Sequence, residues 1–557
     1  MNRFICLVAL LPFLLFAISC NITFHETETI VNNGDDSSDF VEEQTWNSIV
    51  SISWDGSEAV VGELPEGVSV SNTEGCVTIT STAKHIEYVV SGEGTGQLNI
   101  YSNYKLKLSL NSLNLTSNSG PAINNQCKKS LYVVLTGDNT LADGSTYTDS
   151  EEDRKAALFS EGQIIVSGDG TLDITGNYKH AIASDDYIRV REGGLTLQAN
   201  ASDGMHANDG IIINGGTISI NATGEGIQCD TSSVVITGGE LNITSTGDKG
   251  ILAYGSIDIT GGNIIVRSVD KGIKSKAGDI VISGGSVNVT TTGDDGKGVL
   301  AKTGKFVMTD GVLTVNTSGS SAKGIKSVDD MTISGGTITV ICTGGSSSSS
   351  REFAGPGGGP GGGPGGGPGG GPGGGPGNES SGPEGIESKA ALTISGGTIY
   401  AQSTDDAINS GSDMNITGGN VCAYSTGNDG LDANGDCHIT GGIVYAIGTN
   451  SPEVGIDANT EQRKQLYITG GTVVAIGGLE NGASVNIKST SSTWSKNTWY
   501  ALYSGSELVM AFKTPSSGGN TMAVCTADSP SLKSGVTVSG GNSIWNGMGN
   551  IDGTVNE

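Results

Sequence analysis

Charged residues recur at a fixed place in a repeated sequence unit. The residue two positions before an Ile-type residue is acidic, then basic, then acidic along the chain: Asp203, Glu225, Lys249, Lys271, Lys297, Lys323, Glu384, Asp406 and Asp429. Further lysines, namely Lys274, Lys276, Lys302 and Lys326, thicken the basic part. Lysines stacked about 5 Å apart repel by ~0.8 kcal/mol in bulk water and by ~3 kcal/mol at an effective dielectric of 20, so they need anions nearby. The row indicates either a solvated stripe balanced by Asp248, Asp270 and Asp295, or a groove for an anionic glycan such as a polyuronate.

A second group of side chains offers oxygen ligands for a metal ion. Acidic or amide residues follow the Ile-type residue by three positions in consecutive units, and other carboxylates lie close in sequence. The candidate ligands are Glu161, Asp185, Asp186, Asp203, Asn208, Glu225 and Asp230. Ca²⁺ takes six to eight oxygen ligands, so we predict bound calcium here, with solvated surface acids as the alternative. A later acidic run is the candidate for another ion: Glu384, Glu387, Asp406, Asp429, Asp432 and Asp457.

Two tyrosines and one histidine complete the candidate chemistry. Tyr400 and Tyr445 occupy one offset two units apart, with Cys422 between them. We predict that both rings point outward and stack on sugar faces, although exposed tyrosines without function are the alternative. His206 lies between Asp203 and Asp209, where it is a base, a metal ligand or a surface histidine with acidic neighbours.

The element that must position these residues is an internal repeat. Strands ending in Gly-Gly or a close variant recur, and their final glycines lie 22 to 29 residues apart except for one step of 61. Such a period indicates a solenoid, and the alternation in Thr217-Ile218-Ser219-Ile220 indicates strands rather than helices. We therefore predict an all-β fold, a right-handed parallel β-helix of about 12 coils with β caps at both ends. In this geometry equal sequence offsets become neighbours about 4.8 Å apart.

The chain divides into five segments around this repeat. Arg3, an apolar run over 4–18 and Ala17-Ile18-Ser19-Cys20 are typical of a bacterial lipoprotein signal peptide. Residues 1–19 are then removed, Cys20 carries the lipid, and 20–45 is a flexible tether. Residues 46–128 form the N-terminal β cap and first coils, 129–478 the β-helix with a disordered Gly/Pro/Ser insertion at 344–383, and 479–557 the C-terminal β cap. We expect a lipid-anchored protein of the bacterial cell envelope, at the outer membrane or cell surface. An ordinary secretory signal cut elsewhere is the alternative.

Composition narrows the function classes. Glycine supplies 90 of 557 residues and aromatic residues 5%, which excludes a large aromatic-rich core. The net charge of −29 repels a phosphate backbone, so we expect no nucleic-acid partner. Seven cysteines remain beside Cys6 and Cys20 without a C-x-x-C pair, which favours structural rather than redox roles.

Three stretches together resemble one known family. They are LNSLNLTSNSGPAINNQCKKSLYVVLTGDNTLADGSTY (110–147), KAALFSEGQIIVSGDGTLDITGNYKHAIASDDYIRV (155–190) and SDGMHANDGIIINGGTISI (202–220). They resemble the bacterial carbohydrate-binding β-helix family, surface proteins with a polysaccharide-lyase-like fold that bind cellulose and acidic pectic glycans and carry calcium. That family usually has Asp-Asp-Gly-Ile in its coils. Asp203-Gly204-Met205 and Asp429-Gly430-Leu431 match, whereas the central coils have Lys-Gly-Ile.

Three functions remain in view. The first is a non-catalytic carbohydrate-binding lipoprotein that recognises plant-type or acidic polysaccharide, pectin or polyuronate and also cellulose, through Lys249, Lys271, Lys274, Lys297, Lys323, Tyr400 and Tyr445. The second is a calcium-dependent polysaccharide lyase of the pectate type, in which a lysine or His206 abstracts a proton during β-elimination. The third is a structural surface adhesin. No catalytic residue is assigned, because a repetitive exposed stripe supplies no defined cleft.

Overall fold

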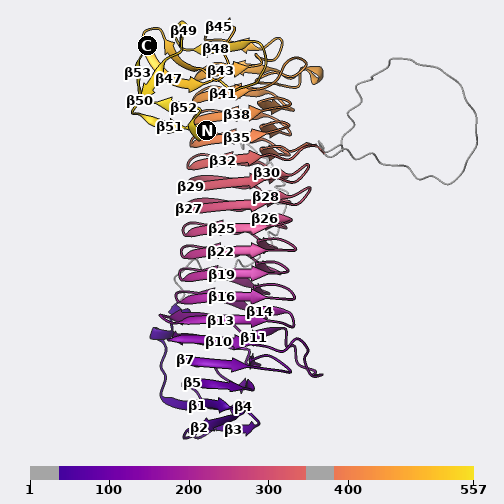
Figure 1. The fold of residues 1–557 in the computed structure, drawn as a ribbon, viewed down its shortest axis with the longest axis vertical. Coiled ribbons are helices and arrows are strands. Elements are labelled where there is room, and N and C mark those ends of the chain that lie inside the picture. Colours follow the sequence, from indigo (N-terminus) through magenta and orange to yellow (C-terminus); the bar gives the residue numbers. More distant parts are fainter. Residues whose placement is uncertain (1–36, 347–381, 557) are drawn as a thin grey trace, which may run out of the picture.

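Three columns of short strands build a parallel β-solenoid in the computed structural model (Figure 1). The structure describes residues 37–346 and 382–556. The all-β prediction is confirmed, but the described residues form about 15 coils rather than about 12. The difference lies at the N-terminal end, where parallel coils continue through units that lack the Gly-Gly pair used to count them.

Each coil contributes one strand to a 15-stranded sheet and two to a 31-stranded sheet. The 15-stranded sheet contains β3 (Val68–Thr73), β4 (Cys76–Ser81), β6 (Gln97–Ser102), β8 (Ile123–Asn125), β11 (Ala156–Ser160), β14 (His180–Ser184), β17 (Met205–Ala207), β20 (Ile227–Cys229), β23 (Ile251–Ala253), β26 (Lys271–Ser275), β28 (Lys297–Ala301), β30 (Lys323–Ser327), β33 (Ile386–Ser388), β36 (Ile408–Ser410) and β39 (Leu431–Ala433). Apart from the β3–β4 hairpin, its neighbouring strands are parallel and in register.

The two other columns pack against this sheet. Strands before the Gly-Gly turn are β9 (Leu131–Thr136), β12 (Ile164–Gly168), β15 (Tyr187–Val190), β18 (Gly210–Ile213), β21 (Val234–Ile236), β24 (Ile257–Ile259), β31 (Met331–Ile333), β34 (Leu392–Ile394), β37 (Met414–Ile416), β40 (Cys437–Ile439), β42 (Leu466–Ile468) and β44 (Ser484–Val485). Strands after it are β10 (Asp138–Ala142), β13 (Thr171–Gly176), β16 (Gly194–Ala199), β19 (Thr217–Ala222), β22 (Glu240–Ser245), β25 (Asn263–Ser268), β32 (Thr337–Cys342), β35 (Thr398–Ser403), β38 (Asn420–Ser425), β41 (Ile443–Ile447) and β43 (Thr472–Ile476). Long strands run through both columns as β5 (Ile86–Thr95), β7 (Leu106–Thr116), β27 (Ile280–Thr291) and β29 (Phe306–Thr317).

Antiparallel strands close both ends of the solenoid. At the start, β1 (Ser48–Gly56) pairs with β2 (Glu58–Val61). At the end, β43 pairs with β48 (Met522–Thr526), which also pairs with β45 (Lys488–Ser492). The remaining elements are β46 (Trp499–Ser504), β47 (Glu507–Lys513), β49 (Pro530–Ser534), β50 (Thr537–Ser539), β51 (Asn542–Ile544), β52 (Gly549–Ile551), β53 (Thr554–Asn556), η3 (Thr460–Gln462) and η4 (Trp545–Gly547). Such closure protects the open sheet edges of the terminal coils.

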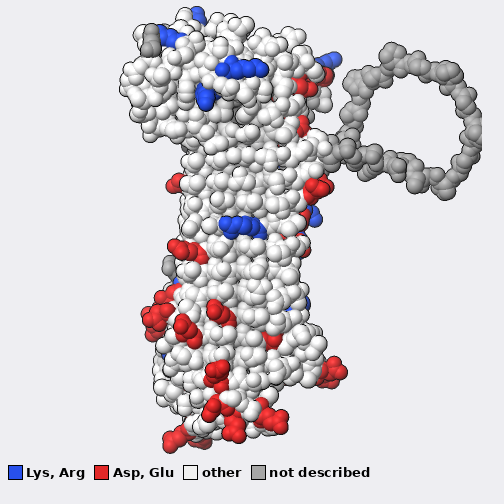
Figure 2. All heavy atoms as spheres, in the orientation of Figure 1, with Lys and Arg blue, Asp and Glu red and all other residues white. Residues whose placement is uncertain are grey.

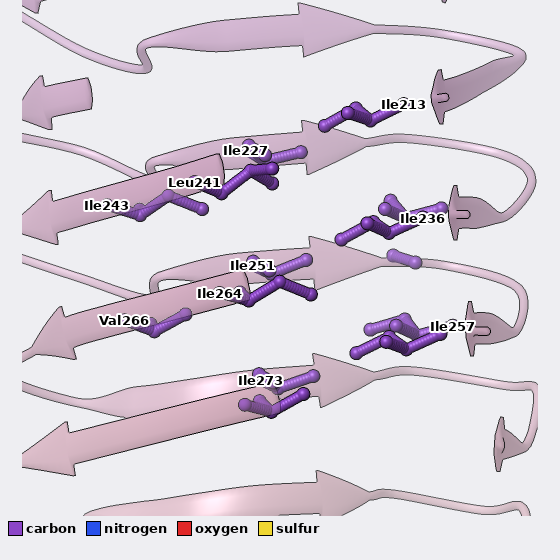
Figure 3. Packing of buried hydrophobic residues seen from close by; sticks show 14 of the residues in the cluster. Ile213, Ile227, Ile236, Leu241, Ile243, Ile251, Ile257, Ile264, Val266 and Ile273 are labelled. Atoms are coloured by element: carbon purple, nitrogen blue, oxygen red, sulfur yellow. The ribbon is translucent and has the colours of Figure 1, made fainter. Parts of the chain in front are cut away.

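The core is a narrow column of aliphatic side chains inside the coils. Ile227, Ile251 and Ile273 are register partners on successive strands, and each is fully buried (Figure 3). Their neighbours Leu241 and Ile264 fill the space from the opposite column. Since identical shapes stack one coil apart, the chain needs few aromatic residues to exclude water.

The Gly-Gly pair is explained by the turn between two columns. Gly262 has φ +90°, a conformation that glycine adopts without the steric cost of a side chain. A Cβ atom on Gly261 would lie 2.3 Å from the carbonyl oxygen of Thr237 in the preceding coil. The first glycine therefore allows coils to approach, and the second allows the chain to turn.

The N-terminal segment folds back onto the side of the solenoid. η1 (Ser37–Asp39) and η2 (Val41–Glu43) lie against the strand column that contains β15. Asp39 is 2% exposed, and its Oδ2 accepts a 2.8 Å hydrogen bond from Nη1 of the buried Arg189. Both carboxylate oxygens of Glu42 accept bonds from Arg191 at 2.8 Å. The prediction of a flexible tether is therefore wrong for this segment, because two ion pairs hold it in place.

Several sequence predictions fall outside the described residues. These are the signal peptide 1–19, the lipidation site Cys20, the tether up to residue 36 and most of the insertion 344–383. In the part that the structure describes, no helix is both long enough and apolar enough to cross a bilayer. The seven cysteines of that part are all free and six of them are buried, as expected for structural residues.

Candidate functional site

The 15-stranded sheet carries two rows of charged and polar side chains, the candidate functional residues. The first row stands two residues before each Ile-type core residue, and its lysines are register partners in β26, β28 and β30. The second row is the residue after the Ile-type residue: His206, Gln228, Leu252, Lys274, Leu300, Lys326, Glu387, Asn409 and Asp432. Sequence offsets thus become spatial rows, as predicted.

Charge is ordered along this face and sparse on the 31-stranded sheet. Figure 2 shows few charged side chains on the broad front face, whereas acidic groups gather over the N-terminal coils. Acidic (red) and basic (blue) side chains occur together in Figure 2 along one edge of the solenoid, the edge where Figure 1 labels β26, β28 and β30. On the 15-stranded sheet the strand register places the basic stripe between acidic coils, with Asp203 and Glu225 before it and Asp406 and Asp429 after it.

Both ends of the basic stripe are neutralised by acids. Lys249 forms ion pairs with Asp248 and, at 3.3 Å, with Glu225. At the other end Lys323 is 2% exposed, and its Nζ lies 2.7 Å from Glu384 and 3.0 Å from Glu387. The prediction that Lys323 contacts a glycan is wrong, because its ammonium group is enclosed between these two carboxylates.

The centre of the stripe differs from its ends. Lys274 has no carboxylate partner among the described residues, and Nζ of Lys297 donates only to the carbonyl oxygen of Asp295, at 2.6 Å. Burial, followed by the charges of Lys249 and Lys271, lowers the pKa of Lys274. Burial and then Lys271 lower the pKa of Lys297 in the same way. An anion that binds between half-buried lysines offsets their mutual repulsion, so its binding is favourable.

A buried acidic cluster lies in the coils that follow. Its members are Asp406, Asp429, Asp432 and Asp457, and Asn409 joins two of them with Nδ2 hydrogen bonds of 3.3 Å to Asp406 and 2.7 Å to Asp432. Burial, then repulsion between neighbouring carboxylates, raises the pKa of both Asp406 and Asp429 to about 8. The pKa of Asp457 is raised to about 7 and that of Asp432 well above its ordinary value. Carboxylate oxygens are the ligands that Ca²⁺ prefers, but no three of these four acids have ligand atoms that all lie within 4.8 Å of one another.

The predicted calcium ligands of the earlier coils mostly have partners within the protein. Glu161 faces Lys128 at 3.7 Å, Asp185 is paired with Lys155, and Glu225 with Lys249. Asp186 accepts hydrogen bonds from Gln163 and from the backbone of Tyr187, and Nδ2 of Asn208 lies 3.5 Å from Asp185. Most of these oxygens already have partners within the protein, so they do not form one open cage.

The remaining two ligands of that set, Asp203 and Asp230, contact histidines. Nδ1 of His180 and Nδ1 of His206 lie 3.1 Å and 3.0 Å from the same Asp203 oxygen, and Nε2 of His206 lies 3.3 Å from Asp230. Burial lowers the pKa of His180. Burial acts to raise the pKa of Asp203, but the hydrogen bonds from both histidines outweigh it and lower the pKa. The sequence singled out His206 but missed His180, which belongs to the preceding coil.

Both candidate sugar-stacking tyrosines are buried. Tyr400 is 3% exposed and Tyr445 is fully buried. The ring of Tyr445 lies 5.1 Å from that of Phe512 and 6.0 Å from that of Trp545. The prediction of outward rings is wrong, because the C-terminal cap covers this part of the solenoid.

A basic hollow near the N-terminal end was also missed. It measures about 610 Å³ and is lined by Lys84, Tyr104, Lys105, Lys128 and Lys129 together with other polar residues. Nζ of Lys84 lies 4.8 Å from the ring centroid of Tyr104. These residues precede the regular repeat, so no common offset pointed to them.

Comparison with known proteins adds a family assignment to this geometry. Residues 73–320 and 234–430 match the model of a family described as carbohydrate-binding domain-containing protein. One solved structure, a polysaccharide lyase-like protein from C. thermocellum in a gadolinium derivative, matches with 24% identity over 43% of this chain and 91% of that chain, at a TM-score of 0.33. No curated protein matches the sequence.

Proposed function

This chain belongs to the carbohydrate-binding domain-containing family, and we propose that it binds an acidic polysaccharide on the 15-stranded sheet, without catalysing a reaction. Pectin or another polyuronate is the first candidate ligand and cellulose the second. The observation that carries the proposal is the closeness of Lys274 and Lys297 to Lys271 in a protein with a net charge of −29: Lys271 is the register partner of Lys297 and is paired with Asp270, whereas Lys274 and Lys297 have no carboxylate partner among the described residues. Their mutual repulsion disfavours the free state and favours a ligand with regularly spaced carboxylates.

The row geometry suits a polymer rather than a small anion. The lysines of β26 and β28 are register partners, so their ammonium groups recur along the solenoid axis. Leu252 and Leu300 flank Lys274 in the second row and are almost fully covered. They remove water from the ammonium group, which strengthens its attraction to a carboxylate. A chain of uronates lying along the axis would meet one cation after another.

We further propose that calcium binds in the cluster of Asp406, Asp429, Asp432 and Asp457. The fit rests on the donor set, which is made of carboxylate and amide oxygens, and on the absence of an ion pair between these four acids and any lysine or arginine of the described residues. When bound, Ca²⁺ would supply positive charge in place of protons and extend the cationic face toward the C-terminal coils. Asn409 would orient two of the carboxylates.

Binding can be tested by affinity electrophoresis in gels that contain polygalacturonate. The double variant K274A/K297A should migrate as it does without the glycan, because both half-buried cations are lost. Added salt should weaken binding of the unaltered protein through screening of the charges. A matched control is K84A/K128A, which removes two lysines from the basic hollow. If K274A/K297A still binds polygalacturonate, or if only K84A/K128A loses binding, the glycan does not bind on the basic stripe.

A polysaccharide lyase is the second candidate, since a lowered lysine pKa suits a general base for proton abstraction beside a carboxylate. Incubation of the protein with polygalacturonate and Ca²⁺ distinguishes a lyase from a non-catalytic binding protein. Growth of ultraviolet absorbance from an unsaturated product, abolished by K274A, would favour the lyase. Stable binding without product favours the non-catalytic role.

The envelope anchor is a separate proposal that concerns Cys20. We propose that the mature protein carries lipid there and lies at the bacterial outer membrane or cell surface. Metabolic labelling with a fatty acid should mark the protein but not its C20S variant. Equal labelling of both would exclude this anchor.

A further inference from the structure

Two histidines and an aspartate from adjacent coils form a buried cluster beside the basic stripe. His180 is the first residue of β14, Asp203 precedes β17 by two residues, and His206 is the middle residue of β17. Their exposed fractions are 2%, 3% and 6%. The strand register pairs Ile182 with Met205, so His180, two residues before Ile182, is level with Asp203 of the next coil.

The nitrogen and oxygen atoms of this cluster converge. Nδ1 of His180 lies 3.1 Å and Nδ1 of His206 3.0 Å from Oδ2 of Asp203. The two rings stack with centroids 4.2 Å apart and planes inclined by 21°. One ligand atom from each residue lies within 4.8 Å of the other two, and no other group of three potential ligands in the described residues meets this condition.

The polar partners of His206 restrict what can occupy the space between these atoms. Its Nε2 lies 3.3 Å from Oδ2 of Asp230, and its Nδ1 lies 3.0 Å from Oδ2 of Asp203, so each ring nitrogen faces a carboxylate. A cation between Nδ1 of His206, Nδ1 of His180 and Asp203 would be attracted to the carboxylate of Asp203.

The surroundings resemble the support that a metal ligand receives. A histidine that binds metal through one nitrogen usually donates the other N–H to a carboxylate. Asp230 fills this role for His206, and Oδ1 of Asp230 is itself held by Nε2 of Gln228 at 2.6 Å. By contrast, the buried Nε2 of His180 has no hydrogen-bond partner among the described residues, and its Nδ1 accepts the backbone N–H of Asp203 at 3.3 Å.

We propose that His180, Asp203 and His206 bind a divalent transition-metal ion of the zinc class. Zinc bonds to nitrogen and oxygen of about 2.0–2.1 Å in a tetrahedron separate the ligand atoms by roughly 3.3 Å. Two of the observed separations are 3.0 and 3.1 Å, close to this value. To bind the ion, the two stacked rings must turn so that both Nδ1 atoms point to it, and Nδ1 of His180 must release the backbone N–H of Asp203, which it accepts at 3.3 Å. Two imidazoles favour Zn²⁺ over Ca²⁺, which prefers oxygen ligands. The site is distinct from the proposed calcium cluster and does not depend on the proposed glycan.

The test is metal binding to the full mature chain after dialysis against a chelator. Isothermal calorimetry with Zn²⁺ in the presence of excess Ca²⁺ should give one site per chain. Co²⁺ added in its place should give the visible absorption of a tetrahedral complex. H206Q should abolish both signals, while H438Q, which removes a histidine stacked on Tyr467 elsewhere in the solenoid, should leave them unchanged.

If H206Q disturbs the buried sheet, a second variant, D230N, tests whether the cluster binds Zn²⁺. The side chain of Asp230 is 39% exposed, and among the three proposed ligands it contacts only His206, at Nε2. D230N should retain native circular dichroism and weaken Zn²⁺ binding by about 10–100-fold, as expected for a residue that supports a ligand. A folded wild-type chain that binds no Zn²⁺, or one whose affinity is unchanged by D230N and by folded H206Q, would overturn the proposal and leave a hydrogen-bonded cluster.

Discussion

The acidic cluster makes the local stability of the C-terminal coils depend on pH and on calcium. The ordinary pKa of an aspartate is 3.8, whereas that of Asp429 in the folded protein is about 8. Between these values the folded state holds a proton that the unfolded state has lost. The free energy of unfolding of the metal-free protein must therefore fall as pH rises from about 4 to 8.

The size of the effect follows from the same shift. One pKa unit corresponds to 1.36 kcal/mol, so about four units on Asp429 correspond to roughly 5 kcal/mol for that group alone. Asp406 and Asp457 are shifted for related reasons, but the groups repel one another, so their contributions do not add. We expect a loss of about 5 kcal/mol for the cluster between pH 4 and pH 8.

Hydrogen exchange at the amides of β36 and β39 measures this local stability, once intrinsic exchange rates are corrected for pH. Calcium should restore the protection of these amides against exchange at pH 8. The expected gain in local stability is about 2.7 kcal/mol when the calcium concentration is 100 times its dissociation constant. D429N should raise protection at pH 8 without calcium, because one repelling charge is removed, and should reduce the response to calcium. D169N, at an exposed acid, is the matched control. Protection that is constant from pH 4 to 8 in the metal-free protein would refute the reasoning.

Three other substitutions test the packing. D39A leaves the buried Arg189 without its carboxylate partner and should destabilise the protein by about 3–5 kcal/mol in urea titrations, whereas an unchanged midpoint would show that the N-terminal segment does not dock. G272A places a Cβ 2.0 Å from Cγ1 of Val289 and should cost about 1–3 kcal/mol, visible as a lower Tm; a wild-type Tm would argue against this close approach. I251A removes a fully buried side chain from the core column and should cost about 2–5 kcal/mol by the same assay, unless the column collapses around it.

The repeat explains why so much of the fold was predictable. Each coil is specified by local residues, such as Gly261-Gly262 for the turn and Ile251 for the core, so a pattern of offsets is enough to place the rows. The coil count was too low because the coils around β4 and β6 have other turns.

What the sequence missed depends on contacts between distant segments. Tyr445 has the offset of an outward residue, and only the C-terminal cap with Phe512 buries it. His180 joins His206 through the register of two coils, and Lys323 is enclosed by Glu384 across the 344–383 insertion. Offsets along a single row do not contain this information.

The docking of η1 and η2 also decides where a mechanical load enters the molecule. Tension applied ahead of residue 37 would reach the solenoid sideways, through Asp39 and Arg189 on β15, and not through its first rung. The coils between β1 and β10 would then carry no part of a force applied between the N-terminal segment and the C-terminal cap. The first event under such a force would be the rupture of the two ion pairs that hold the N-terminal segment, and not the separation of the first strand from its neighbour.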